Sequence, residues 1–143
     1  MDRPAVDAVL DAFHAAAASA DEEAYVATLA DSMVFLGTAP GERWQAGEWR
    51  EFVHSYFSRG KGWSYVPSSR SVNVAEDGLT AWFDETVTNE HYGSCRGTGV
   101  LRRSDEGWKI EQYNLTIPVP DELAPELVAR IRELRLPGPS ERS

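Results

Sequence analysis

The stretch from residue 80 to residue 120 constrains the fold most strongly, because it predicts three consecutive β-strands. Its β-branched and aromatic residues are interrupted by turn-forming residues at 89–93 and again at 104–107. Clusters of Gly, Asn, Asp and Ser between short runs of this kind favour tight turns and strands over helices. The stretch therefore predicts a β-meander around which the rest of the chain is organised.

The sequence before the meander predicts three helices and two extended segments. Apolar residues at helical spacing predict one helix over about 4–18 and another over about 46–57. Ser19 followed by Glu22 matches a capping box, which predicts that a further helix starts there. Apolar and alternating patterns predict extended chain at 32–38 and 63–76.

After the meander, the sequence predicts one more helix over about 122–134, with a start at Ala124 as an alternative because Pro125 suits the first turn. We interpret residues 1–136 as one domain and expect 137–143 to form a disordered tail. Helices followed by antiparallel strands predict an α+β fold. A sheet of this class has one face covered by helices and the other free for solvent or a partner.

Charge and composition exclude several classes of function. The net charge of −9 argues against nucleic-acid binding, which requires a basic surface, and against binding to an anionic membrane. The chain has no apolar run near the roughly 20 residues that span a bilayer, and its N-terminus does not resemble a signal peptide. The single cysteine, Cys95, is typical of a protein in the reducing cytoplasm. We expect neither a metal nor a cofactor.

Four segments carry a resemblance to a known family. They are FLGTAPGERW at 35–44, TAWFDE at 80–85, RGTGVLRR at 96–103 and GWKIEQYNLTIPVP at 107–120. With the order of the predicted elements, they resemble the SnoaL-like branch of the nuclear transport factor 2-like superfamily over about residues 6–123. The WKIxQYN ending is the most specific part of the resemblance.

The resemblance implies a cone-shaped, strongly curved antiparallel sheet wrapped around the N-terminal helices, with a pocket between them. It also implies a homodimer that packs through the open sheet face. The superfamily contains polyketide cyclases, isomerases, dehydratases and epoxide hydrolases as well as non-enzymes, so the fold does not settle the function. In many SnoaL-like sequences the last strand ends in a histidine, whereas this chain has Gln112, Tyr113 and Asn114 there.

The second strand of the meander contains the adjacent carboxylates Asp84 and Glu85. Neighbouring side chains in a strand point to opposite faces, so only one of the two can face a pocket unless a bulge intervenes. We select Asp84 as the candidate acid or base, because Trp82 shares its face and would form an aromatic wall. The alternative is a salt bridge to Arg96 on the next strand, which would make the carboxylate a poor base. Arg96 is also a candidate contact for the ligand.

The last strand of the meander supplies two candidate amides. Alternation places Gln112 and Asn114 on the face of Trp108 and Ile110, which suits a greasy pocket whose mouth orients a ligand by hydrogen bonds. The alternative is that these amides only satisfy buried backbone groups. The opposite face of this strand, which would include Tyr113, suits a dimer contact.

The histidines and the cysteine give weaker signals. His14 lies at the margin of the first helix's apolar stripe, where we expect a capped or core histidine although it could face the pocket. His91 and Cys95 are expected to be exposed loop residues, and His54 is expected to be solvated.

Together, these residues and the resemblance predict a protein with a small-molecule pocket, in which a largely apolar compound is isomerised, cyclised or dehydrated. The alternative is a non-catalytic ligand-binding or dimerisation module.

Overall fold

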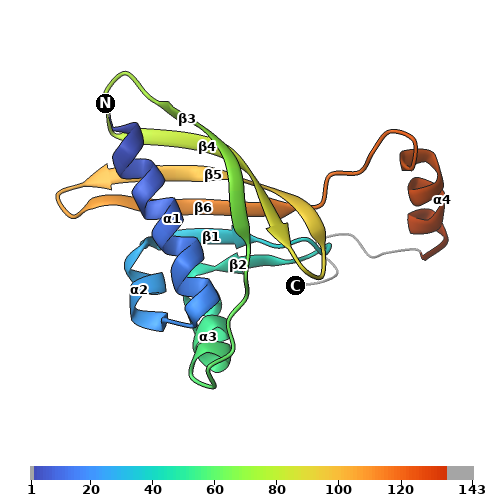
Figure 1. The fold of residues 1–143 in the computed structure, drawn as a ribbon, viewed down its shortest axis with the longest axis horizontal. Coiled ribbons are helices and arrows are strands. Elements are labelled where there is room, and N and C mark those ends of the chain that lie inside the picture. Colours follow the sequence, from blue (N-terminus) through green and yellow to red (C-terminus); the bar gives the residue numbers. More distant parts are fainter. Residues whose placement is uncertain (1, 135–143) are drawn as a thin grey trace.

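The computed structural model of the chain describes residues 2–134, which form one curved sheet with helices on one of its faces (Figure 1). The sheet has six strands in the order β2-β1-β6-β5-β4-β3. Neighbouring strands are antiparallel except for β1 and β6, which run parallel. The α+β class expected from the sequence is confirmed. The strands are β1 (Leu29–Leu36), β2 (Arg43–Gln45), β3 (Val66–Val74), β4 (Thr80–Asn89), β5 (Gly93–Ser104) and β6 (Gly107–Thr116).

Helix α1 (Arg3–Ser19) lies across the inner face of the sheet and contacts both β3 and β6 (Figure 1). Its predicted stripe is buried, since Val6 and Leu10 are fully inaccessible and Phe13 nearly so. Pro4 stands in the first turn, where its missing N–H removes no helical bond. The helix ends at Ser19, and the following C-cap residue, Ala20, turns the chain with its left-handed φ of 56°.

The second helix, α2 (Glu22–Ala27), starts two residues later than the capping box predicts. Asp21 caps it, because the Asp21 carboxylate accepts a hydrogen bond of 3.1 Å from the Ala24 N–H. Ser19 instead belongs to the last turn of α1, where its hydroxyl donates to the carbonyl of Ala15. The sequence therefore correctly predicts a capped helix start in this segment, but the capping residue is Asp21 and not Ser19.

The third helix, α3 (Ala46–Phe57), has the bounds that the sequence predicts. Its capping box joins Gln45 and Glu48, and its buried residues are Trp49, Val53 and Phe57. These side chains pack against α2 and β1, which closes one end of the helical layer. The layer and the inner face of the sheet together enclose the core.

The meander of β4, β5 and β6 confirms the three strands and both turns predicted over 80–120. One irregularity was not predicted. Val100 pairs with Gln112 while Leu101 pairs with Ile110, so Glu111 is an extra residue in β6 and forms a bulge. Because side chains alternate along a strand, this extra residue reverses the faces of everything after it.

The last helix, α4 (Ala124–Leu134), starts at the alternative position given by Ala124. It stands away from the body of the molecule (Figure 1), and none of its residues is buried. Its apolar side chains, which include Leu127 and Ile131, are exposed. The predicted tail at 137–143 lies outside the described residues. No helix within 2–134 has the length and apolar character needed to cross a bilayer.

Candidate functional site

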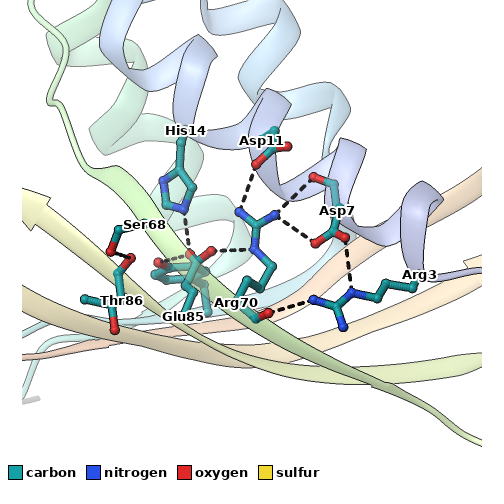
Figure 2. Close-up of polar contacts among 9 residues, drawn as sticks. Arg3, Asp7, Asp11, His14, Ser68, Arg70, Glu85 and Thr86 are labelled. Atoms are coloured by element: carbon teal, nitrogen blue, oxygen red, sulfur yellow. Dashed lines mark hydrogen bonds and ion pairs between the residues drawn. The ribbon is translucent and has the colours of Figure 1, made fainter.

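A buried carboxylate lies on the inner face of the sheet, in the middle of β4. Glu85 of β4 is only 2% exposed and accepts hydrogen bonds from three different elements (Figure 2). Its Oε2 is 2.6 Å from Nε2 of His14 on α1 and 2.7 Å from the hydroxyl of Tyr113 on β6. Its Oε1 accepts a bond of 2.7 Å from Nε of Arg70 on β3. A buried charge is tolerated when it is paired and hydrogen-bonded in this way.

Local geometry explains why these side chains meet. Glu85 alternates with the buried residues Phe83 and Val87, so it must point inward. His14 follows Leu10 by one helical turn and therefore shares its inward stripe. The bulge in β6 turns Tyr113 to the same side.

A glycine leaves the space that the tyrosine needs. Gly97 of β5 pairs with Glu85, and a Cβ atom at this position would lie 2.0 Å from the hydroxyl oxygen of Tyr113. Any other residue would therefore push the phenol away from the carboxylate. The contact between Tyr113 and Glu85 depends on this one missing side chain.

A second layer of charge surrounds Arg70, which is directly opposite Glu85 in the register of β3 and β4. Its guanidinium lies 3.0 Å from a carboxylate oxygen of Asp7 and 3.0 Å from one of Asp11, both on α1 (Figure 2). The Asp7 contact is a hydrogen bond, whereas Nη2 beside Asp11 lacks the angle of one. Arg70 therefore connects the buried Glu85 to the partly exposed carboxylates of α1.

The bonds around Glu85 set its charge. Burial raises the pKa of Glu85, but the hydrogen bond and charge of His14 and the hydrogen bonds from Tyr113 and Arg70 together outweigh burial and leave that pKa below its ordinary value. Burial and the neighbouring carboxylate raise the pKa of Tyr113, so its phenol stays neutral and donates. Glu85 is therefore an ionised, fully occupied acceptor and a poor base.

This arrangement fixes the tautomer of His14. An ionised carboxylate can only accept, so Nε2 of His14 must carry the proton in the bond to Glu85. In the neutral ring the other nitrogen, Nδ1, then holds a lone pair. No side chain or backbone group within residues 2–134 is hydrogen-bonded to Nδ1. Nδ1 of His14 is thus the position of this cluster that the other described residues leave open to a ligand.

A cavity leads to the cluster from the side of α3 and β1. Its outer part has a volume of about 260 Å³, and its aromatic walls are Phe35, Trp44, Trp49, Phe52, Trp63, Tyr65 and Tyr92. A narrow inner part of about 20 Å³ shares Phe35, Trp63 and Tyr65 with it and is lined at its far end by His14 and Tyr113. The inner part has room for about one water molecule. His14 also borders a second hollow of about 320 Å³, on the side of Asp11 and Pro67.

Tyr65 stands where the two parts meet. Burial, with smaller contributions from the nearby Cys95, Tyr92 and Glu42, raises the pKa of Tyr65 to about 12. The Tyr65 phenol is therefore neutral at physiological pH and can donate a hydrogen bond into the cavity.

The structure corrects the predicted orientation of the acidic pair. Asp84 is exposed on the outer face of the sheet, and Trp82 beside it is 48% exposed. Alternation was predicted correctly, but the inward set is the one that contains Phe83 and Glu85. Trp82 does not mark the inward face, because the other face of β4 carries the buried apolar residues Phe83 and Val87.

The two amides and the arginine also lie on the outer face. The bulge at Glu111 moves Gln112 and Asn114 away from the side of Ile110, so they do not line the cavity. In register, Gln112 is beside Val100 and Asn114 is beside Thr98. Arg96 is exposed and is paired with Thr86 and Thr116. The structure therefore brings all five predicted site residues to one face, and that face is opposite the cavity.

The remaining candidates divide between surface and core. His91 is exposed, and His54 is exposed with its ring 2.9 Å from Glu22. Cys95 was expected in an exposed loop but is buried within β5. Burial raises the pKa of the Cys95 thiol. Within 2–134, no three potential ligands among His, Cys, Asp and Glu form a metal-binding group.

Sequence reasoning missed Arg70 and weighed His14 too lightly. Arg70 has the same parity as Val72 and Val74 in β3, so alternation alone could have placed it on the inner face. Its pairing with Glu85 needs the register, which no local pattern supplies. The inward turn of Tyr113 depends on the bulge, for which the sequence carries no clear signal.

The comparisons with known proteins agree with this architecture. The SnoaL-like domain family matches residues 6–120. No curated protein sequence matches the chain. Among solved structures, an NTF2-like protein of unknown function from Pseudomonas putida has 16% identity and a TM-score of 0.66, covering 83% of this chain and 88% of that one.

Two further similar structures are named for activities. A proposed aromatic ring hydroxylase from Novosphingobium aromaticivorans has 21% identity and a TM-score of 0.65, covering 83% of this chain and 90% of that one. A proposed dehydratase of the NTF2-like family from Streptomyces avermitilis has 19% identity and a TM-score of 0.63, covering 80% and 94%. At these identities the similarity establishes a shared fold and nothing about activity.

Proposed function

Taking as premise that the chain belongs to the SnoaL-like domain family, we propose that it binds a small, flat, largely apolar compound and moves a proton on it through His14. One observation carries the proposal. His14 is 7% exposed, is bonded to the ionised Glu85, and lines the inner end of an aromatic cavity. A histidine oriented by a buried carboxylate is a common general acid–base arrangement.

The chemistry follows from the tautomer. The lone pair on Nδ1 of His14 takes a proton from the carbon next to a carbonyl of the ligand, which leaves an enolate and an imidazolium. Glu85 stabilises the imidazolium and keeps the ring in place, so Glu85 is a positioning residue. The neutral phenol of Tyr65 can donate a hydrogen bond to the enolate oxygen.

Three reactions share this first step. Return of the proton to a different carbon isomerises the ligand, and loss of a β-hydroxyl group as water dehydrates it. Attack of the enolate carbon on a second carbonyl of the same molecule cyclises it. The geometry supports the proton transfer that these reactions have in common. The cavity favours a ring-shaped substrate, because aromatic walls bind flat apolar surfaces well.

Deuterium exchange tests the proposal without a known substrate. The protein is incubated in heavy water with a panel of small cyclic ketones, and deuterium at the carbon beside the carbonyl is measured by mass spectrometry. We expect wild-type protein to accelerate exchange for at least one ketone by about a hundredfold or more, the lower range of general base catalysis. His14→Gln should abolish the acceleration and still bind the ketone.

A matched control separates the site from the surface. His54→Gln changes an exposed histidine in the same way and should leave exchange unchanged. Full exchange in His14→Gln would refute the role of His14. Binding of ketones without exchange by the wild-type protein would instead favour the alternative, a non-catalytic ligand-binding module.

We also propose a homodimer through the outer face of the sheet. The support is that Trp82 is about half exposed there, next to the half-buried Val100 and the amides of Gln112 and Asn114. A face with an exposed aromatic residue and adaptable polar groups is typical of protein interfaces. Sedimentation at micromolar concentration should give twice the mass of one chain, and Trp82→Glu should reduce it to a single chain. A single-chain mass for the wild type would refute the dimer.

The cytoplasm remains the compartment that we propose. The support is Cys95, the single cysteine of the chain, which is free and buried within β5. A chain with one cysteine forms no internal disulfide, so an oxidising compartment would not stabilise it in that way. Detection of the native protein in a secreted fraction would refute this.

A further inference from the structure

The outer part of the cavity combines aromatic walls with one carboxylate. Seven aromatic side chains line it, and three of them are the tryptophans Trp44, Trp49 and Trp63. Glu42 is the one charged side chain that lines it within residues 2–134, and no lysine or arginine of that range lines either part of the cavity. The apolar ligand of the preceding section accounts for the aromatic walls but gives no role to the charge.

The chain holds the carboxylate of Glu42 in place. Its Oε1 accepts a hydrogen bond of 2.8 Å from the backbone N–H of Ala39. Gly37 leaves room for it, because a Cβ atom there would lie 2.9 Å from the same oxygen. The other oxygen, Oε2, has no hydrogen-bond partner within the described part of the chain. The loop from 37 to 42 therefore presents a fixed negative charge at the wall of an aromatic cavity.

Resting on the function proposed above, we propose that the ligand carries a cationic amine, held between the aromatic walls and Glu42 while its ring extends toward His14. Aromatic faces attract cations through their quadrupole, and cages of this kind suit quaternary and methylated ammonium groups. A carboxylate beside such a cage adds direct charge attraction, which partial burial strengthens. The net charge of −9 also attracts cations to the protein.

A neutral compound of the same shape tests the charge separately from the fit. The two probes are meta-hydroxyphenyltrimethylammonium and meta-tert-butylphenol. They have the same shape, but the first has a positively charged nitrogen where the second has a neutral carbon. Isothermal titration calorimetry measures each against the wild-type protein, Glu42→Gln and Glu76→Gln. We expect the cation to bind the wild type about tenfold more tightly than the neutral probe, as cation–aromatic and charge attraction together imply.

The glutamine variants assign the preference to one residue. Glu42→Gln keeps an oxygen that can accept from Ala39, so the loop should stay folded while most of the preference for the cation is lost. Glu76→Gln removes the same charge from the exposed turn between β3 and β4 and should leave the preference intact. Equal melting temperatures of the two variants check that the fold is unchanged.

Each outcome decides the inference. A preference for the cation that Glu42→Gln removes and Glu76→Gln keeps supports it. Equal or tighter binding of the neutral probe, or a preference unaffected by Glu42→Gln, overturns it and leaves the proton-transfer proposal standing. If neither probe binds, the inference fails, and the ketone exchange experiment then decides the proposed function by itself.

Discussion

Replacing Glu85 with glutamine should destabilise the protein by several kcal/mol. The substitution keeps the shape of the side chain and puts an amide NH₂ where one carboxylate oxygen was. If the amide oxygen stays with Arg70, the NH₂ group faces two donors, His14 and Tyr113. Breaking a buried charged pair costs about 3–5 kcal/mol. Arg70 keeps Asp7 and Asp11 as partners, so we expect the lower end, about 3 kcal/mol.

Urea unfolding followed by tryptophan fluorescence at pH 7 measures this loss. The neighbouring substitution Asp84→Asn makes the same chemical change on the exposed face and should alter the free energy of unfolding by about 0.5 kcal/mol or less. The pair therefore compares a buried and an exposed carboxylate one residue apart. A loss below about 1 kcal/mol in Glu85→Gln would refute the reasoning, because it would mean that the three bonds contribute little net stability.

The pH dependence of stability gives an independent check. In the folded protein, burial raises the pKa of Glu85, but the bonds from its three donors outweigh burial. The folded pKa of Glu85 therefore lies below its ordinary value of 4.5. The unfolded chain therefore binds a proton more readily, and the stabilisation is fully present above about pH 4.5 and lost as the pH falls through the lower folded value. Glu85→Gln should lack this part of the acid-induced loss. Equal slopes in wild type and variant would contradict the lowered pKa.

Other parts of the structure give two further predictions. Gly97→Ala should destabilise the fold by about 2–5 kcal/mol, because its Cβ would displace the hydroxyl of Tyr113 and leave Glu85 with one donor fewer. Gly47→Ala is the control, because a Cβ atom there has nothing within 4 Å, and it should stabilise α3 by about 0.5–1 kcal/mol. Urea unfolding measures both changes, and equal effects would contradict the close contact at Gly97. Truncation after Pro120 removes α4, which has no buried residue, and should shift the melting temperature by no more than about 4 °C; a larger fall in thermal unfolding would show that α4 packs on the body.

The sequence by itself determined the fold class and most of the elements. The 3.6-residue period of α1 and α3 and the two-residue alternation of β4 are local signals, and each was sufficient to predict its element. The resemblance to the SnoaL-like family, carried by segment 35–44, three segments of the meander and the order of the elements, correctly implied the curved sheet on helices. Alternation also established that only one of Asp84 and Glu85 could face inward.

Only the tertiary structure decided which residues form the site. The choice between Asp84 and Glu85 depends on which face of β4 the helices cover, and Arg70 reaches Glu85 through a register between two strands. The bulge at Glu111 reverses the predicted faces of Gln112 and Tyr113, since one extra residue shifts a two-residue period by half. Local patterns specify the faces of each element, but the site forms where faces from several elements meet, and that meeting depends on packing between segments far apart in the chain.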